Sequence, residues 1–120
     1  MDEQVNIEEL KDIVKKFCDD RDWGQFRSPK ELAIGAVTES AELLDLFRFK
    51  SDEEIKIMLE DAQKRERISE ELSDVLFFVI RFCQKYDFDV FECFQNKVNK
   101  NAMKYPIEKA KGQNKKYNEL

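Results

Sequence analysis

Two pairs of acidic residues carry the clearest chemical pattern in this sequence: Glu39 with Glu42, and Glu71 with Asp74. Residues three positions apart on an α-helix are neighbours on one face, about 5–6 Å from each other, so each pair can present two carboxylates together. The positions that share the helical-wheel sectors of Glu39 and Glu71 are apolar. We therefore expect these acids to point toward apolar surroundings.

Ionised carboxylates that are buried together must be protonated, paired with cations or bound to a metal. The sequence contains no histidine, which excludes an imidazole-bound zinc and nucleophile pairs of the Ser-His type. A donor set made only of oxygen suits a hard cation such as Mg²⁺, with Mn²⁺ as the second choice. Because Mg²⁺ completes its shell with substrate phosphates, the pattern indicates phosphoryl or nucleotidyl transfer to water. A spare carboxylate would orient or deprotonate the attacking water.

An alternative reading needs no metal. The four acids could instead pair with Arg48, Arg67 or Arg81 in the seam of an ordinary helical bundle. Spacing alone does not decide between the two readings, because an acidic sequence produces Glu-x-x-Glu by chance. The net charge of −5 opposes nonspecific contact with a nucleic-acid backbone, so no nucleic-acid partner is expected.

Capping residues and apolar periodicity predict that the acids are held by helices. Three Gly and two Pro are too few for the turns of a β-sandwich or barrel. The expected class is therefore all-α, a four-helix bundle over residues 1–106 followed by a basic tail over 107–120 that is too poor in apolar residues to fold alone. The main helices are predicted at 7–20, 29–48, about 64–85 and about 90–104, with a short helix from Ser51 to about Leu59.

The predicted helix over 29–48 is apolar on nearly all sides, so it must be buried on most of them. A single chain of this length has little room for that, which predicts that another subunit covers part of the helix. The clustered phenylalanines are expected to be core residues. They are Phe77, Phe78, Phe82, Phe88, Phe91 and Phe94.

Cellular location is predicted from two absences in the sequence. Cys18, Cys83 and Cys93 have no Cys-x-x-Cys spacing, and we expect three buried thiols in a reducing compartment. No signal peptide and no apolar run of membrane-spanning length is evident, so a soluble, cytoplasmic protein with no membrane contact is expected.

Trp23, the only tryptophan, lies in a polar loop where it could stack on a base or cap a core.

The chain resembles the MazG-like superfamily of all-α nucleotide pyrophosphohydrolases, and within it the dCTP pyrophosphatase group. The superfamily pattern is the pair of acidic motifs, the second inside EELSDVLFF. The closer resemblance covers nearly the whole chain. It rests on RDWGQF at 21–26, ESAELLDLFRFK at 39–50, EELSDV at 70–75, the K-x-x-x-N and K-Y-P elements at 97–106, and the final G-x-x-x-K-Y.

This resemblance implies a Mg²⁺-dependent hydrolase that cuts a nucleoside triphosphate between the α and β phosphates and assembles as a homotetramer of four-helix units. It implies that the four acids of the two motifs bind the metal and act in catalysis. The implied substrate-binding residues are Trp23, Phe49, Phe78, Lys97, Asn101, Lys104 and Tyr105.

Three positions depart from the pattern of the dCTP pyrophosphatase group. Phe49 stands where a tryptophan is typical, Phe78 where a tyrosine is typical, and Arg27 where a histidine is expected. A phenylalanine still stacks but donates no hydrogen bond, which weakens discrimination by buried polar groups. The expected substrate is dCTP or a 5-modified dCTP. The alternatives are a dUTP-directed or broad-specificity pyrophosphatase that cleans the nucleotide pool, or a non-catalytic helical oligomerisation module.

Overall fold

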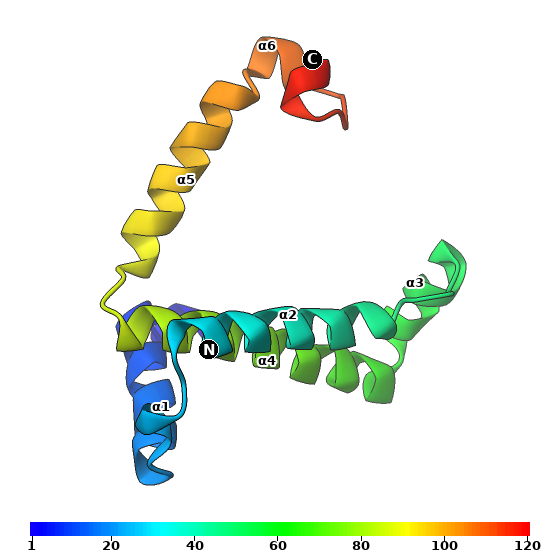
Figure 1. Ribbon diagram of the computed structural model, residues 1–120. Coiled ribbons are helices and arrows are strands. Elements are labelled where there is room, and N and C mark those ends of the chain that lie inside the picture. Colours follow the sequence, from blue (N-terminus) through cyan, green and yellow to red (C-terminus); the bar gives the residue numbers. More distant parts are fainter. The chain divides into compact units, whose positions relative to one another are not determined.

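The computed structural model describes residues 1–120 and contains α-helices, short 3₁₀ turns and no strands (Figure 1). This confirms the predicted all-α class. The chain divides into two compact units, Met1–Asp87 and Phe88–Leu120. The α-helices are α1 (Ile7–Asp20), α2 (Pro29–Asp45), α3 (Asp52–Glu60), α4 (Ala62–Lys85), α5 (Val90–Lys104) and α6 (Ile107–Ala110), and the 3₁₀ turns are η1 (Asp2–Gln4), η2 (Trp23–Gln25) and η3 (Tyr117–Glu119).

Side-chain caps explain where the longer helices begin. In each case the capping oxygen accepts a hydrogen bond from the backbone N–H three residues later, which satisfies one of the free donors of the first turn. The capping residues are Asn6, Ser28, Ser51, Asp61 and Asp89. Ser51 and Glu54 form both bonds of a capping box. The predicted starts of α1, α2, α3 and α5 are confirmed, whereas α4 begins at Ala62 because Asp61 caps it earlier than predicted.

One predicted helix end and the predicted tail differ from the structure. The helix predicted to reach residue 48 ends at Asp45, and the chain continues as a turn to Phe49, whose φ of 64° is left-handed and cannot extend a helix. The tail also has local structure, because α6 and η3 follow α5 within the second unit. The Tyr105 and Tyr117 rings meet edge to face with centroids 6.2 Å apart, and this contact ties η3 to the end of α5.

The first unit is built on α4. Figure 1 shows α2 running beside α4, and this is the most extensive helix pair, while α1 and α3 also pack on α4. α2 carries Gly35 where it faces α4, and an added Cβ there would lie only 2.3 Å from a ring atom of Phe78. The buried apolar side chains come from all four helices. They are Val14, Cys18, Leu32, Met58, Ile68 and Ile80.

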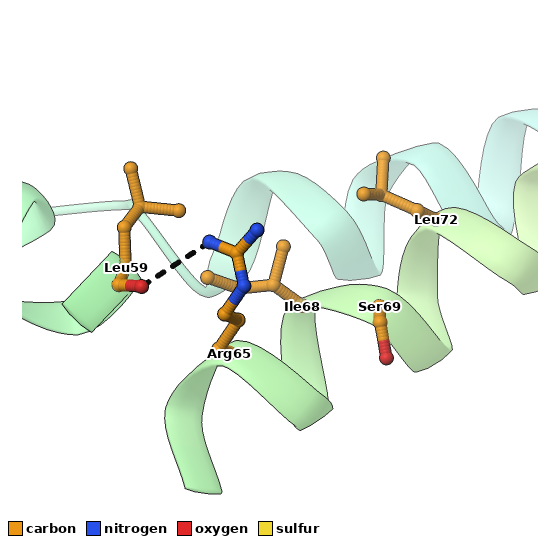
Figure 2. Close-up of a pocket in the computed structure, with 5 residues that line it drawn as sticks. All are labelled: Leu59, Arg65, Ile68, Ser69 and Leu72. Atoms are coloured by element: carbon orange, nitrogen blue, oxygen red, sulfur yellow. Dashed lines mark hydrogen bonds between the residues drawn. The ribbon is translucent and has the colours of Figure 1, made fainter. Parts of the chain in front are cut away.

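A pocket lies where α3 turns into α4, and Figure 2 shows its five lining side chains. Arg65 Nη1 donates a hydrogen bond of 3.2 Å to the backbone oxygen of Leu59, one of the last carbonyls of α3. The remaining lining residues are Ile68, Ser69 and Leu72. No acid lines this pocket, so its polar contact serves to brace the α3–α4 turn.

Several side chains predicted to be buried are exposed in the single chain. On α2, Ile34, Val37 and Leu44 are exposed, so this chain alone does not bury the helix on most sides. Phe88, just before α5, and Phe91 and Phe94 on α5 are also exposed, although all three were predicted to be core. Within its own unit α5 packs against no other long helix, so its apolar side chains have no cover.

The three cysteines differ in burial. Cys18 is buried and Cys83 is partly buried, but Cys93 on α5 is exposed, so the prediction of three buried thiols was wrong for Cys93.

None of the helices combines the length and the apolar character needed to cross a membrane.

Candidate metal centre

The four acids of the two predicted motifs meet between α2 and α4. One carboxylate oxygen from each of Glu39, Glu42, Glu71 and Asp74 can be chosen so that all four lie within 4.8 Å of one another. The two glutamates nearest the helix interface, Glu39 and Glu71, are half-buried, while Glu42 and Asp74 are exposed. The helical spacing therefore predicted correctly which acids come together, and we call these four residues the acid cluster.

Burial and mutual repulsion make the charged form of this cluster unfavourable. Burial raises the pKa of Glu39 above its ordinary value, and Glu42 raises it further through a hydrogen bond and its charge. Burial also raises the pKa of Glu71, with further contributions from the charges of Glu42 and Asp74, while the Arg67 guanidinium opposes the shift. The Oε2 atoms of Glu39 and Glu71 are both buried and have no hydrogen-bond partner.

These features fit a hard divalent cation. Every available donor is a carboxylate oxygen, the ligand type that Mg²⁺ and Mn²⁺ prefer, and the two unpartnered Oε2 atoms are acceptors that an ion would satisfy. A bound cation would also reverse the repulsion that raises the pKa of Glu39 and Glu71. The geometry thus favours a metal site over an accidental grouping of surface acids.

The alternative of arginine pairing is not realised. Arg48 lies 3.8 Å from Asp45, an acid outside the cluster. Arg81 is buried near the C-terminal end of α4, where its Nη1 donates to Gln84. Arg67 is close enough to lower the pKa of Glu71, yet no ion pair joins it to the cluster.

Arg67 is a candidate site residue that the sequence patterns did not assign to substrate. It borders a concave surface beside the acid cluster, together with Glu42, Asp45, Leu46 and Glu71. Arg67 precedes Glu71 by four residues, and this spacing places both on one face of α4. That spacing was the available signal, and a guanidinium at this rim suits a phosphate group.

An aromatic cluster lies one helical turn from the acids and consists of Trp23, Arg27 and Phe78. Cζ of Arg27 is 5.1 Å from the Trp23 ring centroid and 5.4 Å from the Phe78 ring centroid, so the guanidinium contacts both rings. Phe78 follows Asp74 by four residues on α4, which corresponds to about 6 Å along the helix axis. Trp23 and Phe78, both predicted to bind substrate, are thereby brought together on the same side of the acid cluster.

The other predicted substrate residues lie elsewhere. Phe49 is 91% exposed and follows the C-terminal end of α2, whereas Gly35, which contacts Phe78, lies in the N-terminal half of that helix. This chain therefore does not bring Phe49 to the aromatic cluster. The remaining four belong to the second unit. Lys97, Asn101 and Lys104 follow one face of α5 at spacings of four and three residues, and Tyr105 is the C-cap of that helix.

Comparison with known proteins identifies the family. The MazG-like family matches residues 34–120, a range that contains the whole acid cluster. The chain belongs to the MazG-like family. This confirms the resemblance inferred from the acidic motifs.

Individual MazG-like relatives agree with this assignment. The chain is 32% identical over 117 residues to dCTP pyrophosphatase 1 of Mus musculus, an alignment that spans 98% of this chain and 69% of the relative. The same values hold for dCTP pyrophosphatase 1 of Homo sapiens. Among solved structures, a pyrophosphatase from Archaeoglobus fulgidus DSM 4304 superposes with a TM-score of 0.76 and 36% identity, covering 82% of this chain and 91% of that one.

Proposed function

We propose that this chain is a Mg²⁺-dependent nucleoside triphosphate pyrophosphohydrolase that cleaves the α–β phosphoanhydride bond to give a nucleoside monophosphate and pyrophosphate. Family membership and named relatives identify it as a hydrolase of the nucleotide pyrophosphatase type. The observation that carries the finer proposal is the acid cluster, whose four carboxylates converge within 4.8 Å and leave two buried oxygens unpartnered.

In this proposal Glu39, Glu42, Glu71 and Asp74 hold the metal. When bound, Mg²⁺ would polarise a phosphate oxygen and lower the pKa of a water molecule. The chain's own part is to bring the reacting groups together: the more exposed carboxylates orient or deprotonate the attacking water. Arg67 at the rim donates to phosphate oxygens, which offsets the repulsion between the acidic cluster and the triphosphate.

The aromatic cluster is proposed to receive the base. Trp23 and Phe78 offer ring faces for stacking, and the position of Phe78 one turn from Asp74 suits a base joined through a sugar to the α-phosphate. We propose dCTP or a 5-modified dCTP as substrate, since the mammalian relatives are named dCTP pyrophosphatase 1. Phe49 is proposed as a further ring for the base.

The second unit is proposed to contribute contacts to the rest of the nucleotide. Lys97 and Lys104 are cations suited to phosphate oxygens, while Asn101 and Tyr105 offer hydrogen-bonding groups on the same stretch of chain. We retain a division into a catalytic domain over residues 1–106 and a basic tail over residues 107–120 as part of this proposal.

A homotetramer of four-helix units is proposed as the assembled form. Exposed apolar side chains on α2, and separately on α5, support it, because a second copy of the chain could remove them from water. The residues concerned are Ile34, Val37, Leu44, Phe91 and Phe94. In a symmetric assembly, further copies of the chain could cover these side chains, since the same surface occurs on every copy.

The function is tested by measuring pyrophosphate release with Mg²⁺ across dCTP, 5-methyl-dCTP, dUTP, dTTP, dATP, dGTP and the four ribonucleotides, each repeated with EDTA. We expect turnover that EDTA abolishes and that is strongest with the deoxycytidine nucleotides. Equal turnover of all substrates would preserve the metal site but reject the base preference. No turnover with any nucleotide would contradict the proposal and favour a non-catalytic helical module.

A further inference from the structure

We propose that Lys85, assisted by Tyr86, is a positioning residue that holds the α1–α2 loop so that Trp23 and Arg27 face Phe78. The identity of this cluster as the base-binding end of the site rests on the proposed function. The holding contact itself rests on hydrogen bonds between segments far apart in the sequence.

The contacts converge on two carbonyl groups of the loop. Lys85 Nζ donates to the backbone oxygens of Gly24 and Arg27, each at 2.6 Å, across 61 and 58 residues of sequence. The Tyr86 hydroxyl also lies 3.3 Å from the Arg27 oxygen. Hydrogen bonds from a charged donor are roughly twice as strong as neutral ones, so Lys85 makes the dominant contact.

The Lys85 ammonium is committed to this loop. Lys85 is half-buried and forms no ion pair, and its other close neighbour is the Tyr86 ring, whose centroid is 5.6 Å from Nζ. A half-buried cation without a carboxylate partner needs other acceptors, and the two loop carbonyls supply them. Release of the loop would therefore break both charge-assisted hydrogen bonds at once and leave the ammonium and the carbonyls to water.

The loop's other contacts are made within itself, to α1, and through the Arg27 guanidinium to the Phe78 ring. Between α1 and α2 it forms only the short η2 turn, which begins after Asp22 in the left-handed region with a φ of 54°. Gln25 bonds back to Asp22, a contact that shapes the turn without attaching it to α4. The Trp23 ring meets Phe17 of α1 edge to face at 5.6 Å, which leaves Lys85 and Tyr86 as the polar connection to α4.

One stripe of α4 joins this contact to the chemistry. Glu71, Asp74, Phe78, Arg81 and Lys85 follow each other at spacings of three, four, three and four residues, which places them along one helix face. The metal ligands, the ring and the loop contact are thus arranged along one rigid element. Lys85 lies about 16 Å along the axis from Asp74, so it acts on the loop and not on the reacting phosphates.

Four variants and the only tryptophan provide the test. Trp23 is the single Trp of the chain, so its fluorescence reports on this loop alone. In Lys85→Met we expect red-shifted emission and stronger acrylamide quenching with an unchanged far-ultraviolet circular dichroism spectrum. If the loop is then competent only about a tenth of the time, KM for the preferred nucleotide rises about tenfold. The kcat value should stay within about twofold, because the acid cluster is untouched.

Matched variants separate positioning from general stability. Lys85→Arg keeps a charged donor and should recover most of the wild-type KM and emission, while Tyr86→Phe should shift both slightly in the direction of Lys85→Met. Lys16→Met removes an exposed lysine paired with Asp20 and should leave emission and KM at wild-type values.

Either of two results would overturn the proposal. One is Lys85→Met with wild-type quenching and KM. The other is Lys85→Met with lower helical content and an equal loss in kcat, since Lys85 would then support the whole fold. If the wild-type chain hydrolyses no nucleotide, the proposed function fails, yet the quenching comparison still decides whether Lys85 holds the loop.

Discussion

The acid cluster and the aromatic cluster are neighbours along α4, but different forces hold them in place. The four acids stand on two packed helices, and their positions follow from the helix backbone despite repulsion between them. Trp23 and Arg27 stand on a loop whose polar connection to α4 is made by Lys85 and Tyr86. The first site is preorganised against an electrostatic cost, and the second is preorganised by a few hydrogen bonds.

This difference predicts different responses to substitution. A change within the acid cluster should alter the chemistry while the fold persists, because the helices do not depend on the carboxylates. A change around the loop should alter binding, because the groups proposed to meet the base would lose their position. Three substitution experiments can break or sharpen this comparison.

The largest effect is expected from removing a proposed metal ligand. Glu71→Ala or Asp74→Ala should lower kcat by about 100-fold or more, since a lost ligand weakens both metal binding and charge stabilisation. Pyrophosphate release measures the loss, and circular dichroism should show an unchanged helical content. Glu70→Ala, at an exposed position beside Glu71, is the control and should retain full turnover. Wild-type turnover in the two ligand variants would remove the acids from the mechanism.

An intermediate effect is expected from Gly35→Ala. The new Cβ would lie 2.3 Å from the Phe78 ring, so the ring or the helix must shift, and overpacking of this kind costs about 1–3 kcal/mol in the free energy of unfolding. Urea denaturation measures the change.

Gly24→Ala is the matched control for Gly35→Ala. Its added Cβ would meet only Arg81 Nη2, at an ordinary contact distance of 3.9 Å. The free energy of unfolding should therefore change little. Equal effects of the two alanines would show that Phe78 has room to move, and the close α2–α4 contact would then not fix the ring.

The smallest effect is a gain in stability. Folding raises the pKa of Glu39 and Glu71, so their charged forms destabilise the folded chain at neutral pH. Glu71→Gln removes one charge and should raise the metal-free melting temperature slightly. The gain should vanish at a pH below the ordinary carboxyl pKa, where both states of Glu71 are protonated. A lower melting temperature at neutral pH would show that Glu71 stabilises the fold.

The same variant tests metal binding by the native chain. Added Mg²⁺ should raise the melting temperature of the wild-type chain, because a ligand that binds only the folded state stabilises it. Glu71→Gln should respond less, and an equal response would place the ion elsewhere.

Local patterns predicted those parts of the structure that local forces determine. Asn6, Ser51 and Asp89 marked helix starts correctly because a cap bonds only three residues ahead. The acid cluster was predictable because helical spacing decides which side chains share a face. The end of α2 could not be predicted in this way. The turn that replaces its last predicted residues depends on the left-handed φ of Phe49, and the residue type at that position does not indicate a left-handed conformation.

Features that depend on distant segments could not be predicted from one sequence. Nothing in the sequence distinguishes Lys85 from the other lysines. Only the fold brings it to the carbonyls of Gly24 and Arg27. The exposure of Phe91 and Cys93 likewise depends on which segments cover α5, and helical periodicity shows only that the face is apolar.

The contact between Gly35 and Phe78 limits how the proposed base site could adapt to another base. The space for the ring comes from a missing Cβ, and no smaller residue exists with which to enlarge it. Substitution at position 35 can therefore only narrow the site. In the proposed site, adaptation to a larger or differently substituted base would begin at the side chains of the aromatic cluster, Phe78, Arg27 and Trp23, where atoms remain to be exchanged.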